Sequence, residues 1–309
     1  MLHVLLTNLL FHSQFSQRDD IPTKGQVRAV VPDHCYKRNT LRSLGYVMQS
    51  LLCTAACASL GLLIPMKLIA LPLWIAFACV TGTAAMGLWV LAHECGHGAF
   101  SDNRVLQDTV GYILHTICLV PYFSWQRSHA VHHAHTNHVY KVETHVPTVV
   151  NGREGIETTG GTDQMDLAKS MGEKKHGAYQ LFGHLVIGWP SYILAGLTGG
   201  AKYGTSNHFW PYKPFSDALW PGKWAAKVLQ SAAGVGGMLA LLAFWAKRCG
   251  AATVWAWYGG PYLIVNMWLI IYTWLQHTDV SAPQLHARIP SLFSPLTFHL
   301  PPPRSTCLI

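Results

Sequence analysis

The chain has 309 residues, of which 50% are hydrophobic and only 12% are charged. Soluble globular proteins carry about 25% charged residues, so this composition excludes a disordered chain and argues against an ordinary soluble enzyme. The net charge of +8 is not gathered in one long basic run, so we expect no nucleic-acid partner. The composition instead favours a membrane protein whose basic residues lie in loops.

Four apolar segments without a charged residue predict membrane-spanning helices, because about 20 helical residues cross the hydrocarbon core. Short turns at 65–67 and 247–250 join these segments in pairs. The sequence therefore predicts an all-α membrane protein with two transmembrane helical hairpins. The four predicted spans are 46–64, 68–92, 228–246 and 251–275.

The predicted membrane domain covers 46–283, between an N-terminal segment (1–45) and a divergent tail (284–309). Nineteen of the 22 Lys and Arg residues lie outside the two hairpin turns. The positive-inside rule then places both termini and the long middle segment in the cytosol. Two weaker apolar stretches, 111–123 and 181–200, are predicted to lie in the membrane interface beside a cytosolic, histidine-rich helical cap.

Histidines gather at three places in the sequence. His93-Glu94-Cys95-Gly96-His97 ends the second apolar segment, His129-Ala130-Val131-His132-His133 follows in the middle segment, and His277 lies just beyond the fourth. Residues three or four apart share one face of a helix, so each cluster can present its imidazoles together. Because the second and fourth spans end on the same side of the membrane, we expect the three places to meet there.

Six imidazoles exceed the three or four protein ligands of a zinc site, and nitrogen ligands with open positions suit iron and oxygen chemistry. We therefore predict two metal ions and assign no catalytic residue beyond their ligands. His135, His138 and His145 are either groups that orient the ligands or residues of a solvated loop. The predicted metal ligands are His93, His97, His129, His132, His133 and His277.

The first cluster also fits the H-E-x-x-H pattern of zinc peptidases, in which the Glu is the general base. That reading gives no role to the second cluster or to His277, and the sequence offers no obvious third zinc ligand. It is the weaker hypothesis. Five aromatic residues near the clusters either shape a path for a ligand or form an interfacial aromatic belt. They are Trp89, Tyr122, Phe123, Trp125 and Trp274.

Together these motifs resemble the membrane fatty-acid desaturase family, and within it the Δ12 (ω-6) acyl-lipid branch. The resemblance covers roughly 22–283 and includes, besides the histidines, the segments 119–125, 144–147, 207–209, 221–224 and 272–280. It implies an enzyme with two Fe ions that uses O₂ and two electrons to convert an oleoyl chain of a phospholipid to linoleoyl. The six histidines named above match the family's metal ligands.

The resemblance also implies a separate electron donor, cytochrome b5 or ferredoxin, because the His-Pro-Gly-Gly motif of a fused cytochrome b5 domain does not occur. It favours the endoplasmic reticulum, with the plastid as the alternative. Homo- or hetero-oligomerisation is left open.

One part of the family pattern does not occur here. The third histidine cluster, HxxHH, has no counterpart, since the tail from Gln284 contains only His286 and His299. The nine-histidine set of the family would then lack three members, so we expect weak iron binding and little or no desaturase activity from the chain as given. Two other readings stay open: a related di-iron hydroxylase or epoxygenase, and a catalytically inactive membrane homologue that pairs with an intact paralogue.

Overall fold

The computed structural model describes residues 24–136, 138, 141–146, 167, 169–197 and 199–277. The chain divides into two units, one formed by 1–38 with 295–309 and one formed by 39–294. The described part of the first unit is the helix α2 (Lys24–Val30) and the short turn η2 (Asp33–Tyr36). All the helices and histidines discussed below belong to the second unit.

Four helical segments of the described chain are long and apolar enough to cross a membrane, at 40–63, 68–97, 224–249 and 251–277. They confirm the all-α membrane fold with four spans. The first hairpin consists of α3 (Thr40–Ser59), η3 (Leu60–Leu63), η4 (Leu68–Ala70) and α4 (Leu71–His97). The second consists of α10 (Trp224–Cys249), α11 (Ala251–Val254), the π-helical turn η7 (Trp255–Gly259) and α12 (Gly260–His277).

The ends of α4 place its histidines. Pro72 occupies the first turn of the helix, where its fixed φ angle and missing N–H are tolerated. Gly98 ends the helix in the left-handed conformation, with φ of 75°, which glycine adopts without strain. The helix therefore runs five residues beyond the apolar segment, and His93 and His97 lie on its last turns.

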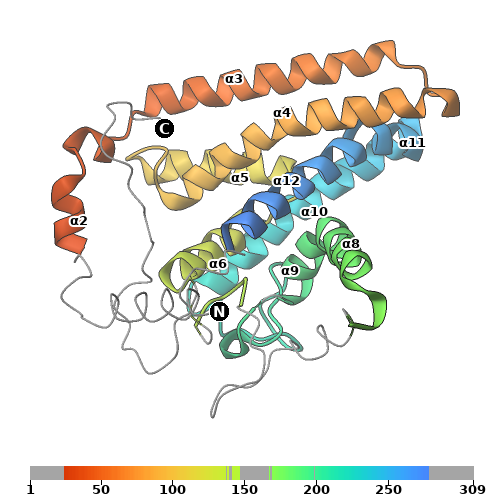
Figure 1. Ribbon diagram of the computed structural model, residues 1–309. Helices are drawn as coiled ribbons and strands as arrows, with labels where there is room; N and C mark the ends of the chain where they lie inside the picture. The colour runs from red at the N-terminus through yellow and green to blue at the C-terminus, as the bar shows by residue number, and fades with distance from the viewer. Residues whose placement is uncertain are drawn as a thin grey trace, which may run out of the picture. The chain divides into compact units, whose positions relative to one another are not determined.

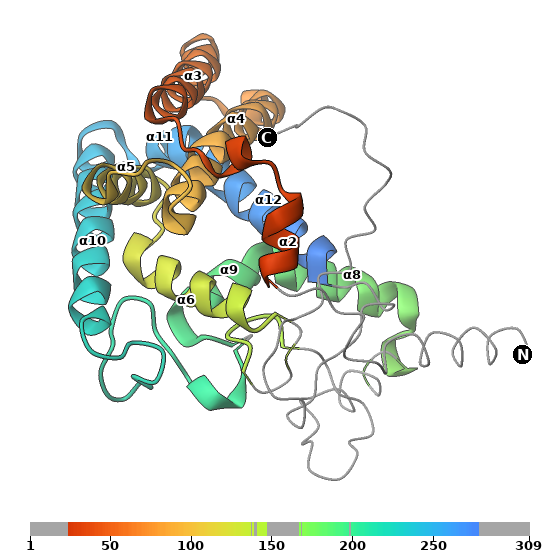
Figure 2. The same cartoon turned by 90° about the vertical axis from the view of Figure 1, so that its left-hand side faces the viewer.

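Helix α4 packs against α3, α5 (Arg104–Ile117) and α12. Figures 1 and 2 show α4 and α12 side by side, both running from the end near α11 toward α6 (Tyr122–Ala134). Gly82 permits this approach, since a Cβ there would lie 2.6 Å from both the Ile264 Cβ and the Pro261 carbonyl oxygen. Small residues at such contacts let helix backbones come close in membranes. His97 and His277 consequently end their helices on the same side.

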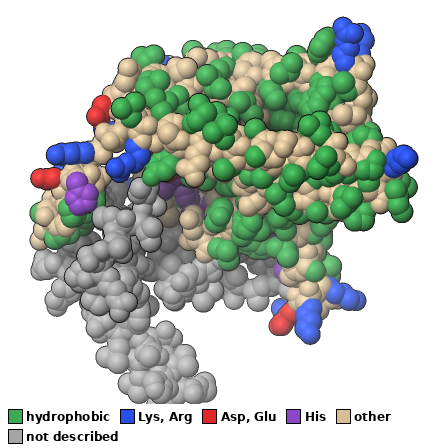
Figure 3. All heavy atoms as spheres, turned by 90° about the horizontal axis from the view of Figure 1, so that it is seen from above, with side chains coloured by type: hydrophobic (Ala, Val, Ile, Leu, Met, Phe, Trp, Pro, Cys, Tyr) green, Lys and Arg blue, Asp and Glu red, His purple; other side chains and the backbone are tan. Residues whose placement is uncertain are grey.

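The outer surface of the hairpins is apolar. Figure 3 shows hydrophobic side chains spread over one face, with Lys and Arg only at its margins. Leu62, Leu68 and Ile69 are more than 75% exposed. Contiguous apolar surface of this kind is unusual on a soluble monomer and is suited to contact with lipid.

The two weaker apolar stretches are divided differently from the prediction. The stretch 111–123 is not one element, because α5 ends at Ile117 and α6 begins only after a break at Leu119 (φ of 55°) and Pro121. Most of the stretch 181–200 belongs to a longer helical run, 173–195, which Gly196 caps in the left-handed conformation. That run consists of α8 (Glu173–Gly183), η5 (His184–Gly188) and α9 (Trp189–Ala195). An interfacial location for these segments stays a prediction.

Most of the aromatic residues singled out in the sequence lie in the core. Trp89, Tyr122, Phe123 and Trp125 are buried, so an interfacial belt is the wrong interpretation for these four. Trp89 and Trp125 belong to a cluster with Val265 and Leu269 of α12 and with residues of α9. The core therefore lies directly beneath the histidines.

Candidate metal centre

Four of the predicted ligands form one compact group, which we call the four-histidine group. His93 and His97 come from the end of α4, and His129 and His133 come from α6. One ligand nitrogen of each lies within 4.8 Å of those of the other three. The Nε2 atom of His129 is 2.9 Å from that of His93, 3.1 Å from that of His97 and 3.0 Å from that of His133. The predicted i, i+4 spacing thus brings each pair onto one helix face.

Hydrogen bonds alone do not account for this arrangement. The Nε2 atoms of His93, His97 and His129 lie within 3.2 Å of one another. Each nitrogen of a neutral imidazole either carries a hydrogen or presents a lone pair, so at least two of any three are alike and repel each other. A cation between them removes the conflict, because all the lone pairs can then point to the same place. The geometry and donor chemistry therefore fit a metal ion.

Glu94, to which the sequence analysis assigned no role, holds His93 in the ligand form. The Nδ1 atom of His93 lies 3.0 Å from Oε1 of Glu94. An ionised carboxylate only accepts hydrogen bonds, so Nδ1 donates and Nε2 keeps its lone pair. Carboxylates beside metal-bound histidines fix the tautomer and orientation of the ring in this way.

Replacing Glu94 with alanine is expected to weaken metal binding by about 10–100-fold, the usual cost of removing a group that orients a ligand. Glu94→Gln should cost less, because its amide oxygen still accepts a hydrogen bond. Titration of the purified chain with Co²⁺, followed by visible absorption, measures the affinity. Glu173→Ala, at an exposed position in the first turn of α8, is the control. Equal affinities for Glu94→Ala and this control would contradict the role.

The other two predicted ligands form a second contact. His132 of α6 and His277, the last residue of α12, have their Nε2 atoms 2.9 Å apart. Nδ1 of His277 donates to the carbonyl oxygen of Thr273 at 2.5 Å, which leaves Nε2 with its lone pair. The imidazole rings of His129 and His132 are 6.1 Å apart between centroids. All six predicted ligands therefore come together at one end of α4, α6 and α12.

The histidines of α6 are neutral at physiological pH. Burial lowers the pKa of His132 to about 3, and the neighbouring His277 and His145 lower it further. Burial and the surrounding histidines also hold the pKa of His129 and of His133 below the ordinary value. Neutral imidazole is the form that binds metals, so these rings have ligand nitrogens without any deprotonation step.

Two tryptophan side chains, Trp125 and Trp89, pack beside the four-histidine group. The ring of Trp125 stacks on His129 with centroids 4.4 Å apart, and it lies 5.3 Å from the ring of His93. Gly96 makes room for it, since a Cβ there would come within 2.7 Å of the Trp125 ring. Trp89 packs against Trp125 at 5.5 Å. Both tryptophans stand near the histidine clusters in the sequence, but no sequence pattern indicates that Trp125 contacts a predicted ligand.

Glu143 is a buried acid near the centre that the sequence analysis missed. The hydroxyl of Tyr192 in α9 donates to Oε2 of Glu143 at 3.4 Å and also shares a hydrogen bond with Ser128 of α6. Burial raises the pKa of Glu143 to about 7. No sequence motif indicates a role for Glu143, because a single Glu in a polar stretch is ordinarily a surface residue. These contacts connect the segment 141–146 and α9 to the helix that carries His129.

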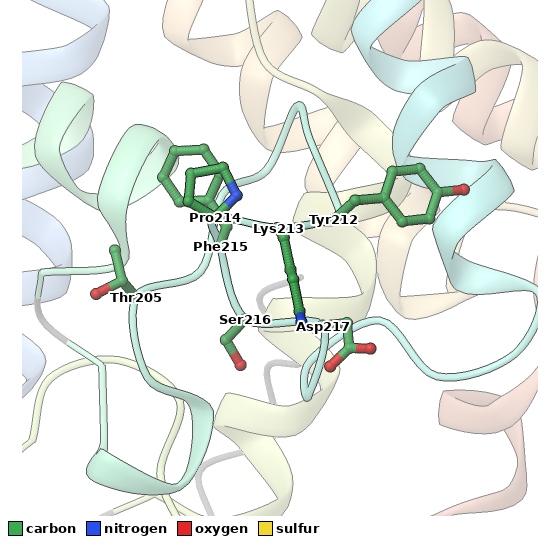
Figure 4. A pocket seen from close by; sticks show the side chains of 7 residues that line it. All are labelled: Thr205, Tyr212, Lys213, Pro214, Phe215, Ser216 and Asp217. Atoms are coloured by element: carbon green, nitrogen blue, oxygen red, sulfur yellow. The ribbon is translucent and has the colours of Figure 1, made fainter.

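Other features lie apart from these histidines. His135 and His184 each direct Nδ1 to a carbonyl of their own helix, those of Val131 and Gln180. A surface pocket is formed by the loop before α10, and Figure 4 shows its side chains around one stretch of that loop. None of the histidines lines it. Its lining residues are Thr205, Tyr212, Lys213, Pro214, Phe215, Ser216 and Asp217.

Comparison of the sequence with known proteins points to one family. The fatty acid desaturase family model matches residues 70–301, which extends beyond Pro283, where the recognisable motifs end. The chain is 35% identical over 280 residues to the oleate hydroxylase FAH12 of Claviceps purpurea, covering 83% of this chain and 57% of the relative. It is 35% identical over 266 residues to the Delta(12)-fatty-acid desaturase of Arabidopsis thaliana, covering 84% and 64%.

A third relative, the Delta(12) fatty acid desaturase FAD2 of Calendula officinalis, is 34% identical over 267 residues, covering 84% of this chain and 65% of the relative. The chain thus spans less than two thirds of the length of these three relatives. The family model covers most of the chain, and the six histidines that match the family's metal ligands lie on α4, α6 and α12. The chain belongs to the fatty acid desaturase family, a family of membrane oxidoreductases.

Proposed function

We propose that the protein is a Δ12-type acyl-lipid desaturase that converts oleoyl chains of phospholipids to linoleoyl chains with O₂, two electrons and a di-iron centre. The observation that carries this proposal is the convergence of imidazole nitrogens from α4 and α6, at 2.9–3.2 Å from one another. Two of the relatives compared above are named Delta(12) desaturases, which supports the position of the new double bond.

The histidines divide into ligands for two ions. His93, His97, His129 and His133 would hold one iron, and His132 with His277 would contribute to the other. Bound iron supplies the oxidising chemistry that removes hydrogen from an unactivated acyl chain, since no side chain of the protein is a strong enough oxidant.

The protein's own residues position and protect this site. Glu94 and the Thr273 carbonyl hold the Nδ1 protons of His93 and His277, so that their Nε2 lone pairs face the other histidines. Trp125 packs against His129 and limits both its rotation and the approach of water from the core side. Because the long helices expose uncharged apolar faces, an acyl chain can approach the site from the bilayer without meeting a charge.

The electrons come, in this proposal, from a separate donor of the cytochrome b5 or ferredoxin type. We place the protein in the endoplasmic reticulum membrane, which the family resemblance favours. Both termini lie in the cytosol in this proposal, because the basic residues lie predominantly outside the two hairpin turns. The histidines then lie on the cytosolic side, where a soluble or anchored donor can reach them.

Expression in a yeast that makes oleate but no linoleate tests the activity. We expect linoleoyl chains in its phospholipids, at a low level because the tail lacks an HxxHH cluster. Gas chromatography of methyl esters, compared with cells that carry an empty vector, measures the product. Robust linoleate production would contradict the expected impairment, and a membrane-integrated protein that yields no new fatty acid would favour the inactive homologue over the desaturase.

Hydroxylation is the second candidate reaction. The 35% identity to an oleate hydroxylase favours it specifically, because this relative matches the chain over 280 residues. The same lipid extracts separate the two reactions, since a hydroxylase converts oleate to a hydroxylated monounsaturated acid instead of linoleate.

A further inference from the structure

We propose that Gln126 is a positioning residue for the four-histidine group. Its side-chain amide joins α6 to the last turn of α4 and, with support from Asp108 and Tyr122, keeps the histidines of the two helices facing each other. This inference rests on the proposed function, because it assigns a task at the same metal centre to residues outside the ligand set. No motif in the sequence assigns one to Gln126 or Asp108.

The four-histidine group depends on the register between two helices. His93 and His97 come from α4, whereas His129 and His133 come from α6. The Nε2 atom of His129 lies 2.9 Å from that of His93 and 3.1 Å from that of His97. Before a metal binds, these nitrogens bring lone pairs together, and their repulsion favours separation of the helices. Contacts outside the group must therefore hold α6 against the end of α4.

The amide of Gln126 makes such a contact. Helix α4 ends at His97, so the carbonyl groups of its last turn have no partner within the helix. The carbonyl oxygen of Cys95 accepts a hydrogen bond from the N–H of Gly98 at 3.1 Å. The carbonyl oxygen of Gly96 instead accepts one from Nε2 of Gln126 at 3.4 Å. Gln126 therefore connects α6 to the turn that ends in a predicted ligand.

Asp108 of α5 orients this amide. The Nε2 atom of Gln126 also donates to Oδ1 of Asp108 at 3.3 Å, and the Tyr122 hydroxyl donates to the same oxygen at 3.1 Å. An amide nitrogen carries two hydrogens, so the Gly96 carbonyl and the Asp108 carboxylate can each accept one. Neither acceptor can donate a hydrogen bond. The nitrogen end of the amide, and not its oxygen, therefore faces them.

Close packing between α4, α5 and α6 supports this arrangement. A Cβ at Gly111 of α5 would lie 2.4 Å from the Tyr122 ring and 2.8 Å from the Cβ of Cys95. Tyr122 and Cys95 are completely buried. Gly111 and Asp108 are three residues apart and so share one face of α5. The Tyr122 ring therefore crosses α5 at Gly111, and its hydroxyl reaches Asp108 one turn earlier.

Gln126 also lies on the ligand-bearing face of α6. His129 follows it by three residues and His133 by seven, a spacing that keeps all three side chains on one side of a helix. The neighbouring Trp125 stacks on His129 and occupies the space that Gly96 leaves. A rotation of α6 about its axis would therefore move the amide and both imidazoles together, so fixing the amide fixes the ligands.

Three substitutions of Gln126 separate hydrogen-bond donation from side-chain size. Gln126→Met keeps the length of the side chain but cannot donate. Gln126→Glu keeps the shape and directs a carboxylate at two acceptors, whereas Gln126→Lys has only donors and can satisfy both. Gln49→Met is the matched control, because it removes an amide from an exposed position of α3, a helix without predicted ligands.

Titration of the purified full chain in detergent with Co²⁺ measures the dissociation constant of the most tightly bound ion and its visible absorption. We expect Gln126→Met to raise this constant by about 10–100-fold, the usual cost of losing a group that orients ligands. The absorption bands should also change, because the ligands are displaced. Gln126→Glu should bind at least as weakly. Gln126→Lys should restore most of the affinity and the wild-type spectrum, and Gln49→Met should keep both.

The outcomes separate this inference from the proposed function. A wild-type affinity and spectrum in Gln126→Met overturn the positioning role, although the four-histidine group stands. Equal weakening by Gln126→Lys and Gln126→Met also overturns it, because donation would then be irrelevant. A chain that loses thermal stability with Gln126→Met but binds Co²⁺ with the wild-type spectrum and affinity shows a purely structural role.

If Gln126→Met does not fold, Tyr122→Phe decides the question. This variant keeps the buried ring but removes the hydroxyl that donates to Asp108. Weaker Co²⁺ binding with an altered spectrum supports the positioning role, and an unchanged titration overturns it. A wild-type chain that binds no Co²⁺ overturns both the metal centre and the task of Gln126.

Discussion

Replacing His129 with alanine is expected to abolish metal binding at the four-histidine group and, with it, product formation. The Nε2 atom of His129 is the only one in this group within 3.1 Å of all three others, those of His93, His97 and His133. Removing a group that merely orients a ligand costs about 10–100-fold in affinity, so loss of this central ligand should exceed 100-fold.

Iron per purified chain and linoleate in the yeast phospholipids measure the effect of His129→Ala. His135→Ala is the matched control, because it also removes an imidazole at the end of the same helix. The Nδ1 atom of His135 is bonded to the Val131 carbonyl, and His135 is not a predicted ligand. We expect the control to keep the iron content of the wild type. Iron retained by His129→Ala at the level of His135→Ala would show that the four-histidine group is not the metal site.

Gly82→Ala is the second substitution with a large expected effect. The added Cβ would lie 2.6 Å from the Pro261 carbonyl oxygen and 2.6 Å from the Ile264 Cβ, so α4 and α12 must separate. Overpacking of this kind typically costs about 1–3 kcal/mol in the free energy of unfolding. Separation of the helices also displaces His277, which should weaken the second metal group more than the four-histidine group.

Thermal unfolding in detergent and Co²⁺ titration measure the two effects of Gly82→Ala. Gly236→Ala on α10 is the control, since a Cβ at that position meets nothing within 4 Å. The control should be as stable as the wild type or slightly more stable, because alanine favours a helix over glycine. A Gly82→Ala chain that melts together with Gly236→Ala would mean that the α4–α12 contact is not close.

The sequence predicted the features that depend on short-range patterns. Span length follows from uncharged runs, so all four membrane helices were found, although polar ends such as Glu94 to His97 lengthen them. The ligand pairs follow from the spacing of four along a helix, which fixes the face on which His93 and His97, or His129 and His133, lie. Topology then indicated correctly that these pairs and His277 meet.

Other features depend on contacts between distant segments and were not predictable in this way. The space that Gly96 leaves for Trp125 depends on how α4 packs against α6. The break at Leu119, with its positive φ, divides a stretch that appears continuous in hydropathy. His145 likewise gave no spacing signal, because it reaches His277 through a loop conformation with positive φ, which is uncommon for residues other than glycine.

The uninterrupted course of α4 has a geometric consequence for the reaction. A helix rises about 1.5 Å and turns about 100° per residue, so the 27 residues of α4 fix both the height and the facing direction of His93 and His97 relative to the hairpin turn at 65–67. One inserted residue would swing the two imidazoles a quarter-turn away from α6. In the proposed desaturase, the number of residues in α4 would therefore determine how deep in the bilayer leaflet an acyl carbon must lie to be oxidised.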